Sequence, residues 1–308
     1  MINNILTVGT QVIILFILIG VGFVCNKVKM LTPRTLKELT DFVLYIVSPC
    51  VIISSYYRDF DKSMLNGLLL TLFLAFLSYV ISIALAHLTV KDADKNKESV
   101  LRFGAVFSNC GFMSLPLQQA ILGADGVFYG ATYVAVFNIM LWTYGAFLMS
   151  GKKESMCFKN IIINPGVIAT IIGIILFVLP IKIPIIIYEP IKYLSALNTP
   201  VPMIIIGYHL MQSNILKGFT DLKEIFAMAI KLLFYPLIAL GVLYLFGVRG
   251  TMLVSSVISC SAPTAAITTM FSAKYGADTS LSVNMVSLST VLSLATMPVV
   301  ITLAQHIA

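Results

Sequence analysis

Apolar residues run along the chain in long uninterrupted blocks, and short polar loops separate these blocks. Each block is about 20 residues long, which lets one α-helix cross the roughly 30 Å hydrocarbon layer of a bilayer. The blocks lack the in-out alternation of barrel strands. We therefore predict an all-α membrane protein with ten transmembrane helices in a single domain, residues 1–308. The predicted spans are residues 5–26, 36–56, 64–88, 100–121, 126–149, 163–180, 190–212, 223–247, 251–273 and 279–304.

The composition agrees with a membrane location. Of the 308 residues, 59% are hydrophobic and 11% are charged, whereas soluble domains carry roughly 25% charged residues. Placing the N-terminus outside puts fifteen of the twenty lysines and arginines in inward loops and span ends, as the positive-inside rule requires. The +7 charge is thus a topology signal, so we expect no nucleic-acid partner. A multi-pass protein of the cell membrane follows, with both termini extracytoplasmic.

Two short sequence similarities recur at nearly the same offset. Pro200 follows Pro49 by 151 residues, and Gly276-Ala277-Asp278 follows Gly123-Ala124-Asp125 by 153 residues. An offset of about 150 residues holds five spans. Because five is odd, the second copy must face the opposite way across the membrane. We predict two inverted five-helix repeats, at about 1–150 and about 160–308, which is a known plan of secondary transporters.

The fourth and ninth spans of this arrangement contain small, polar, helix-breaking segments. These are residues 107–119, which include Pro116, and residues 259–269, which include Pro263. Freed backbone survives in a membrane only inside protein or beside a cavity. A break also creates helix N-termini, which bind anions through free N–H groups and the helix dipole. We predict that helices 4 and 9 cross at a binding site. The alternative is a pair of proline kinks with small packing residues.

The polar residues of these segments indicate the charge of the cargo. The broken spans offer neutral groups, among them Ser108, Asn109, Ser261 and Thr264, but no acid. Buried carboxylates usually mark cation or proton coupling in membranes, so a cation antiporter is disfavoured and an organic anion is favoured. Neutral oxygens still leave sodium or proton coupling open. We expect Lys231 to reach the headgroups; the alternative is that it attracts anions.

Several motifs resemble the auxin efflux carrier family along essentially the whole chain. They are Phe107-Ser108-Asn109-Cys110-Gly111 with Leu115-Pro116-Leu117, Phe137-Asn138, Asn164-Pro165-Gly166 and Ala262-Pro263. The resemblance implies that a transport domain of spans 3–5 and 8–10 moves against a scaffold of spans 1, 2, 6 and 7, as an elevator. It implies organic anions as cargo: auxin in plants, malate or malonate in bacteria. Asn109 and Asn164 match asparagines near the substrate. Gly166 departs from the plant Asn-Pro-Asn motif, which favours a small carboxylate over auxin.

Together these observations predict a secondary active or facilitative transporter and not an enzyme, with no catalytic residues. No metal or cofactor is expected, since no histidine pair has metal-ligand spacing and no nucleotide-binding loop occurs. A ligand-binding membrane sensor remains an alternative, and so does the cation antiporter. An exposed scaffold would allow a homodimer. The candidate substrate-binding residues are Ser108, Asn109, Cys110, Gly111, Pro116, Asn138, Asn164, Ser261, Pro263 and Thr264.

Overall fold

The chain folds into helices of membrane-spanning length. The computed structural model describes residues 2–152, 158–179, 181–212 and 221–308, and no β-strand occurs within these ranges. Seven helical segments are long and apolar enough to cross a membrane, and two shorter apolar helices, Pro165–Val178 and Gly250–Ser261, accompany them. The predicted all-α membrane class is confirmed. Each of the ten predicted spans contains helix, while the count of ten crossings stays a prediction.

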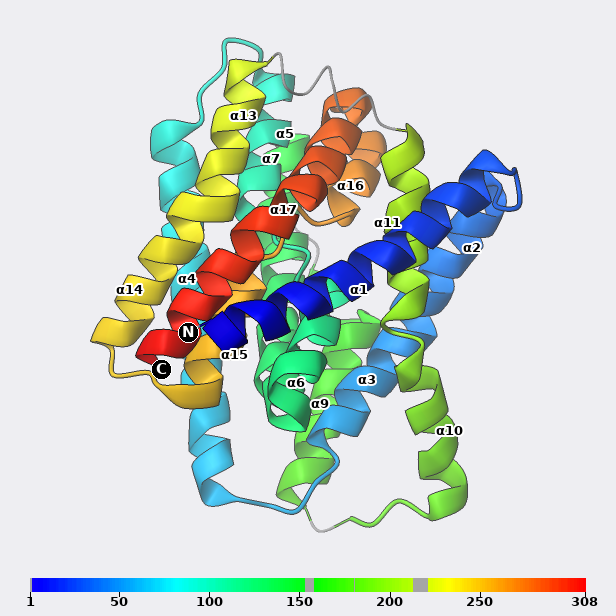
Figure 1. Ribbon diagram of the computed structural model, residues 1–308, viewed down its shortest axis with the longest axis vertical. Coiled ribbons are helices and arrows are strands. Elements are labelled where there is room, and N and C mark those ends of the chain that lie inside the picture. Colours follow the sequence, from blue (N-terminus) through cyan, green and yellow to red (C-terminus); the bar gives the residue numbers. More distant parts are fainter. Residues whose placement is uncertain (1, 153–157, 180, 213–220) are drawn as a thin grey trace.

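Several of the helices are built from more than one piece, as Figure 1 shows. The first half of the chain contains α1 (Ile2–Lys27), α2 (Pro33–Phe42), the π-helical turn η1 (Val43–Val47), α3 (Ser48–Tyr56), α4 (Lys62–Thr89), α5 (Lys95–Val106), η2 (Cys110–Ser114), α6 (Leu115–Met140), η3 (Leu141–Gly145) and α7 (Ala146–Ser150). The second half contains α8 (Phe158–Ile162), α9 (Pro165–Val178), α10 (Ile185–Ala196), α11 (Pro200–Gln212), α13 (Leu222–Ala229), η5 (Ile230–Phe234), α14 (Tyr235–Leu245), α15 (Gly250–Ser261), α16 (Ile267–Tyr275) and α17 (Thr279–Ile307). Gly123 interrupts α6 with a φ of 67°, between the predicted spans 4 and 5.

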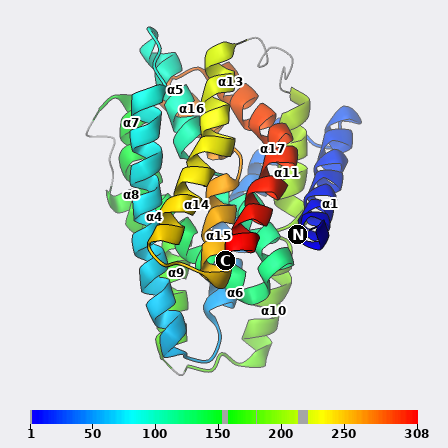
Figure 2. The same cartoon turned by 60° about the vertical axis from the view of Figure 1, so that its left-hand side comes forward.

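The helices pack in two groups. The scaffold group contains α1, α2, α3, α9, α10 and α11: α1 packs across α11 (Figure 1), and α3 packs against α9 and α10. Figure 2 gives a second view of the same helices. The core group contains α4 to α7 and α13 to α17, whose buried apolar side chains form most of one cluster, while a second cluster joins α14, α15 and α17 to α1 and α11. The groups meet where α1 contacts α17 and where α3 and α9 contact α6, and there the Tyr56 hydroxyl lies 2.6 Å from the Thr132 hydroxyl.

Two glycines let α1 and α11 approach each other closely. A Cβ added at Gly22 would overlap the backbone of Ile204, and one added at Gly207 would overlap the backbone of Ile19. Small residues at such contacts are a general device for packing helices in membranes, because backbone can then touch backbone. The contact therefore depends on the absence of both side chains.

Gly22→Ala should consequently weaken the scaffold group. We expect the free energy of unfolding to fall by about 1–3 kcal/mol, because the new methyl group forces α1 away from α11. Gly20 lies on the same helix, is exposed, and has no atom within 4 Å of an added Cβ. Gly20→Ala should therefore be neutral or stabilising by up to about 1 kcal/mol. Thermal unfolding of the two variants in detergent compares them, and equal stability would contradict the packing described here.

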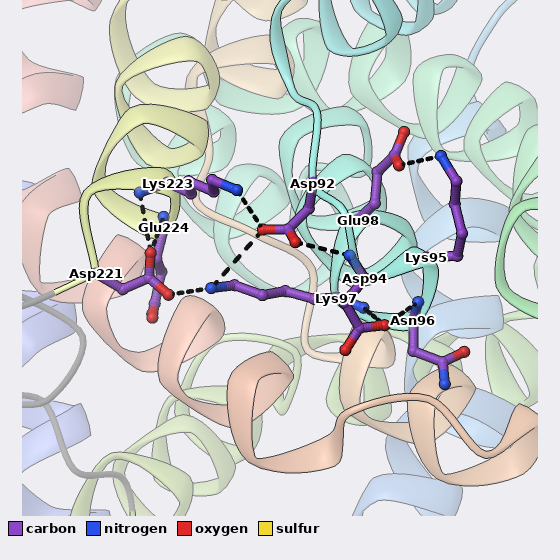
Figure 3. A network of polar contacts seen from close by, with 9 residues as sticks. All are labelled: Asp92, Asp94, Lys95, Asn96, Lys97, Glu98, Asp221, Lys223 and Glu224. Carbon is purple, nitrogen blue, oxygen red and sulfur yellow. Dashed lines mark hydrogen bonds and ion pairs between the residues drawn. The ribbon is translucent and has the colours of Figure 1, made fainter.

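The starts of α5 and α13 lie at the same end of the molecule (Figure 1) and are joined there by ion pairs. Lys97 bonds Asp221 at 2.5 Å, and Lys223 bonds Asp92 at 2.9 Å. Figure 3 shows both pairs. The backbone N–H of Asp94, and then Lys223, lower the pKa of Asp92. Burial raises the pKa of Asp221, but bonds from Lys97 and the backbone bring it below its usual value. The Asp221 bond in turn raises the pKa of Lys97.

These shifts set the pH range in which the network stabilises the fold. A carboxylate with a lowered folded pKa contributes above its unfolded pKa, about 3.9, and its contribution is lost as the pH falls through the folded value. The Lys97 contribution is present below about pH 10.4 and is lost as the pH rises through its raised pKa. The ion pairs therefore stabilise the fold between roughly pH 5 and pH 10.

Asp221→Asn tests this network without removing the helix cap. The Asp221 side chain accepts the N–H groups of Lys223 and Glu224, a role that asparagine fills equally well. Loss of the charge should destabilise the protein by about 1 kcal/mol at pH 7, and this difference should shrink as the pH falls below about 3.9 and through the lowered pKa of Asp221. Thermal unfolding over this pH range measures it. Glu38→Gln breaks only the exposed pair with Arg34 and serves as the control; a pH-independent difference for Asp221→Asn would contradict the assignment.

Candidate functional site

The two predicted helix breaks meet inside the core group. Between α5 and η2 the chain is extended, and so is the chain between α15 and α16, and these segments pair antiparallel at Ser108 and Thr264. The Asn109 N–H donates to the Pro263 carbonyl at 2.7 Å, and the Ala265 N–H donates to the Phe107 carbonyl at 2.9 Å. The predicted crossing is thus present as a two-bond backbone bridge, which satisfies groups that cannot be left unpaired in a membrane interior.

Side-chain hydroxyls satisfy further carbonyls at the ends of α5 and α15. The Thr264 hydroxyl donates to the Gly104 carbonyl at 3.0 Å, and the Ser108 hydroxyl donates to the Cys260 carbonyl at 3.3 Å. Each hydroxyl belongs to one break and bonds the helix that leads into the other. The small polar residues that the sequence places at the breaks therefore bind the two half-helices together.

Several N–H groups at the starts of the next helical segments, η2 and α16, have no such partners in the described part of the chain. The first N–H groups of a helix have no partner within the helix. Among the described residues, no acceptor lies on the N–H groups of Gly111 and Phe112 in η2 or of Ala266 and Ile267 at the start of α16. All four residues line one cavity, so two positive helix ends open onto the same space.

This cavity lies between the scaffold and core groups and has a volume of about 360 Å³. The scaffold side contributes Ser48 and Asn164, and the core side contributes Asn109 and Asn138. Ligand pockets generally range from about 300 to 1,000 Å³, so this one suits a small molecule. A second cavity of about 390 Å³ shares Phe112 and Met270 with it and extends to Pro33, at the start of α2.

Two asparagines connect the groups at the cavity wall. The Asn164 amide donates to the Asn138 side-chain oxygen at 3.2 Å. Its own oxygen accepts the N–H groups of Gly166 and Val167 and so caps α9. A Cβ at Gly166 would come within 2.9 Å of the Asn138 amide nitrogen. Glycine at this position therefore leaves room for the asparagine pair.

Asn109 supplies a polar atom with no partner. Its side chain is 5% exposed, and its amide nitrogen forms no hydrogen bond to any described residue. Buried polar groups are normally paired, so an unpaired donor in a cavity wall needs an explanation. The same residue holds the backbone bridge through its N–H. The fold thus fixes the backbone of Asn109 and leaves its side-chain amide nitrogen buried beside the cavity without a partner among the described residues.

The structure brings together six of the ten predicted substrate-binding residues. The residues in the cavity wall are Ser108, Asn109, Cys110, Gly111, Asn138 and Asn164. Ser261, Pro263 and Thr264 are outside the lining of this cavity and shape the crossing instead.

Pro116 lines a different cavity of about 260 Å³. It lies within α6, directly after the π-helical turn η2, which accommodates its missing N–H. The break therefore falls at residues 107–109, without a proline.

Three charged residues near the crossing were not predicted to lie there. Asp41 and Lys274 line the cavity, although their positions near predicted span ends indicated the membrane surface. The expectation that Lys231 reaches the headgroups is wrong, since its side chain is 0% exposed. Its ammonium group donates to the Ser108 hydroxyl and to the Cys260 carbonyl. A lysine inside an apolar span was the available signal, because such residues usually have a function.

Comparison with known proteins relates the chain to membrane transporters. The sequence model of a family described as membrane transport protein matches residues 7–301. An uncharacterized transporter of Methanothermobacter thermautotrophicus is 26% identical over 293 residues, which cover 93% of this chain and 95% of the relative. The match thus extends over both breaks and over all the described residues of the cavity wall.

Proposed function

The chain belongs to the membrane transport protein family, the family of the auxin efflux carriers, and on this premise we propose that it is a secondary carrier of small organic anions. One observation carries the choice of an anion: two helix N-termini open onto one cavity, and the unpaired Asn109 amide nitrogen is buried in its wall. Each helix end is equivalent to about half a positive charge, and N–H groups at such ends bind carboxylates without a basic side chain. Lys274 and Asp41 in the wall contribute one charge of each sign, so the helix ends supply the excess positive potential.

The size of the cavity favours a small cargo. A volume of about 360 Å³ lies near the lower limit of ligand pockets, which suits a carboxylate such as malonate or malate better than a larger auxin-like acid. Asp41 and the asparagine pair would discriminate between carboxylate ligands by contacting the second polar group that each ligand carries. The ligand would contact Asn109, Gly111 and Asn138, with Asn164 as the scaffold contact.

The position of the cavity favours alternating access. Its wall is shared between the scaffold and core groups, so displacement of one group against the other would move the site and change its exposure. We propose an elevator movement in which the core group carries the cargo past the scaffold group. The asparagine pair, which joins the groups across the wall, would have to separate during this movement.

Uptake into proteoliposomes tests the proposed function. The panel contains malonate, malate, other small carboxylates and indole acetate, with and without sodium, pH and voltage gradients. We expect saturable uptake of at least one small carboxylate that other carboxylates inhibit and uncharged amides do not. Sodium or proton exchange without carboxylate flux would instead identify a cation antiporter, and carboxylate binding without flux would identify a sensor.

A further inference from the structure

Lys231 is buried in the core group behind the crossing. It lies in the π-helical turn η5, its side chain is 0% exposed, and it is not part of the cavity wall. Its ammonium group donates to the Ser108 hydroxyl and, at 3.2 Å, to the Cys260 carbonyl. Ser108 does line the cavity, so a single side chain separates the ammonium group from the space where the cargo would bind.

No carboxylate compensates this charge. Within the described ranges, no acidic side chain forms an ion pair with Lys231, and the groups that face it are the Tyr235 ring at 5.0 Å and the thiols of Cys110 and Cys260. Burying an unpaired ammonium group costs several kcal/mol. A lysine that persists at such a cost in an apolar span points to function.

The ends of two half-helices offset part of that cost. α5 ends at Val106 and α15 ends at Ser261, both at the crossing, and a helix C-terminus carries about half a negative charge. The crossing thus has a negative side formed by carbonyl ends and a positive side formed by the N–H ends in the cavity. Lys231 neutralises the negative side, which leaves the positive side without a partner until an anion binds.

The Lys231 ammonium group already bonds two of the oxygens that a coupling cation at the crossing would need. A metal cation in protein replaces its hydration shell with several carbonyl or hydroxyl oxygens. Here the Gly104, Phe107, Cys260 and Pro263 carbonyls each already accept a hydrogen bond within the crossing. The ammonium group itself holds the Cys260 carbonyl and the Ser108 hydroxyl.

We propose that Lys231 is a built-in counter-charge, which replaces a bound sodium ion at the crossing and allows the carrier to bind its anion without sodium. This inference rests on the proposed function. Lys231 acts as a positioning and electrostatic residue, since Ser108 separates it from the cargo. Removal of its charge should weaken anion binding without weakening the fold, because the Ser108 hydroxyl still donates to the Cys260 carbonyl at 3.3 Å and a desolvated charge disappears.

Proteoliposome uptake of malonate and malate, in sodium and in choline media, tests the inference together with the variants Lys231→Met and Lys62→Met. Lys62 is exposed at the start of α4 and controls for the loss of one lysine. We expect wild-type and Lys62→Met fluxes to be equal in the two media within about twofold. For Lys231→Met we expect an unfolding temperature at or above that of the wild type and at least a tenfold rise in the KM for the anion.

The outcomes separate the two proposals. Carboxylate flux that requires sodium overturns the built-in counter-charge and leaves the proposed function intact. A wild-type KM in folded Lys231→Met overturns it as well. If Lys231→Met does not fold, the sodium dependence of the wild type decides alone. Failure of every carboxylate in the panel overturns the proposed function, and the inference with it.

Discussion

Asn109→Asp should abolish anion transport while leaving the protein folded. The substitution is nearly isosteric, and it puts a carboxylate against the free N–H groups of η2 in place of an unpaired amide. Two negative charges about 4 Å apart repel by about 4 kcal/mol at an effective dielectric constant of 20, which corresponds to roughly a thousandfold loss of affinity. Aspartate is also a favourable residue at a helix N-terminus, and the free N–H groups of η2 offset the cost of burying its charge, so the protein should still fold.

Asn109→Ala separates the loss of a donor from the gain of a charge. A hydrogen bond to a charged ligand is worth about 1.5–3 kcal/mol, so the alanine variant should bind the anion about ten- to a hundredfold more weakly. Uptake kinetics and thermal unfolding of both variants provide the measurement. Asn109→Asp with a wild-type KM would show that the anion does not bind at the crossing.

Ala265→Pro should disrupt the crossing itself. Proline removes the N–H that bonds the Phe107 carbonyl at 2.9 Å and puts ring carbon in its place. Thr264 is already extended, as a residue before proline prefers, so the effect should come mainly from the lost bridge. We expect a destabilisation of at least about 2 kcal/mol, because a buried carbonyl loses its partner, and loss of transport with it.

Ala266→Pro is the matched variant one residue later. The Ala266 N–H has no acceptor among the described residues, and its φ of −58° is compatible with proline. Its removal should leave stability within about 1 kcal/mol of the wild type, while anion affinity falls because the cavity loses one donor. Thermal unfolding and uptake kinetics compare the two variants. Ala265→Pro as stable as Ala266→Pro would show that the backbone bridge does not hold the half-helices together.

The sequence could predict the crossing because the constraint that creates it is local. Freed backbone in a membrane must be paired, and Pro263 among small polar residues marks one place where it is freed. The offset of about 150 residues between the repeated motifs indicated which segment of the first half would pair with the Pro263 segment. Pro116 misled the prediction, because the π-helical turn before it absorbs the missing N–H, and the chain instead opens at residues 107–109.

The charged residues around the crossing could not be predicted in this way. Lys231, Asp41 and Lys274 all lie within a turn or two of a predicted span end, where lysine and aspartate normally reach water or headgroups. Only the packing of the core group shows that Lys231 turns inward to Ser108. Only the meeting of α2, α16 and the breaks shows that Asp41 and Lys274 share one cavity. The contacts themselves depend on tertiary structure, and only the presence of Lys231 inside an apolar span left a signal in the sequence.

The most direct test of an anion carrier built on this crossing is the uptake of labelled malonate, compared with its uncharged diamide, into proteoliposomes containing wild-type protein or Asn109→Asp. We expect saturable malonate uptake by the wild type, no diamide uptake, and no uptake of either by Asn109→Asp. Equal transport of malonate and its diamide by the wild type, or undiminished malonate uptake by Asn109→Asp, would show that the crossing does not bind a transported anion.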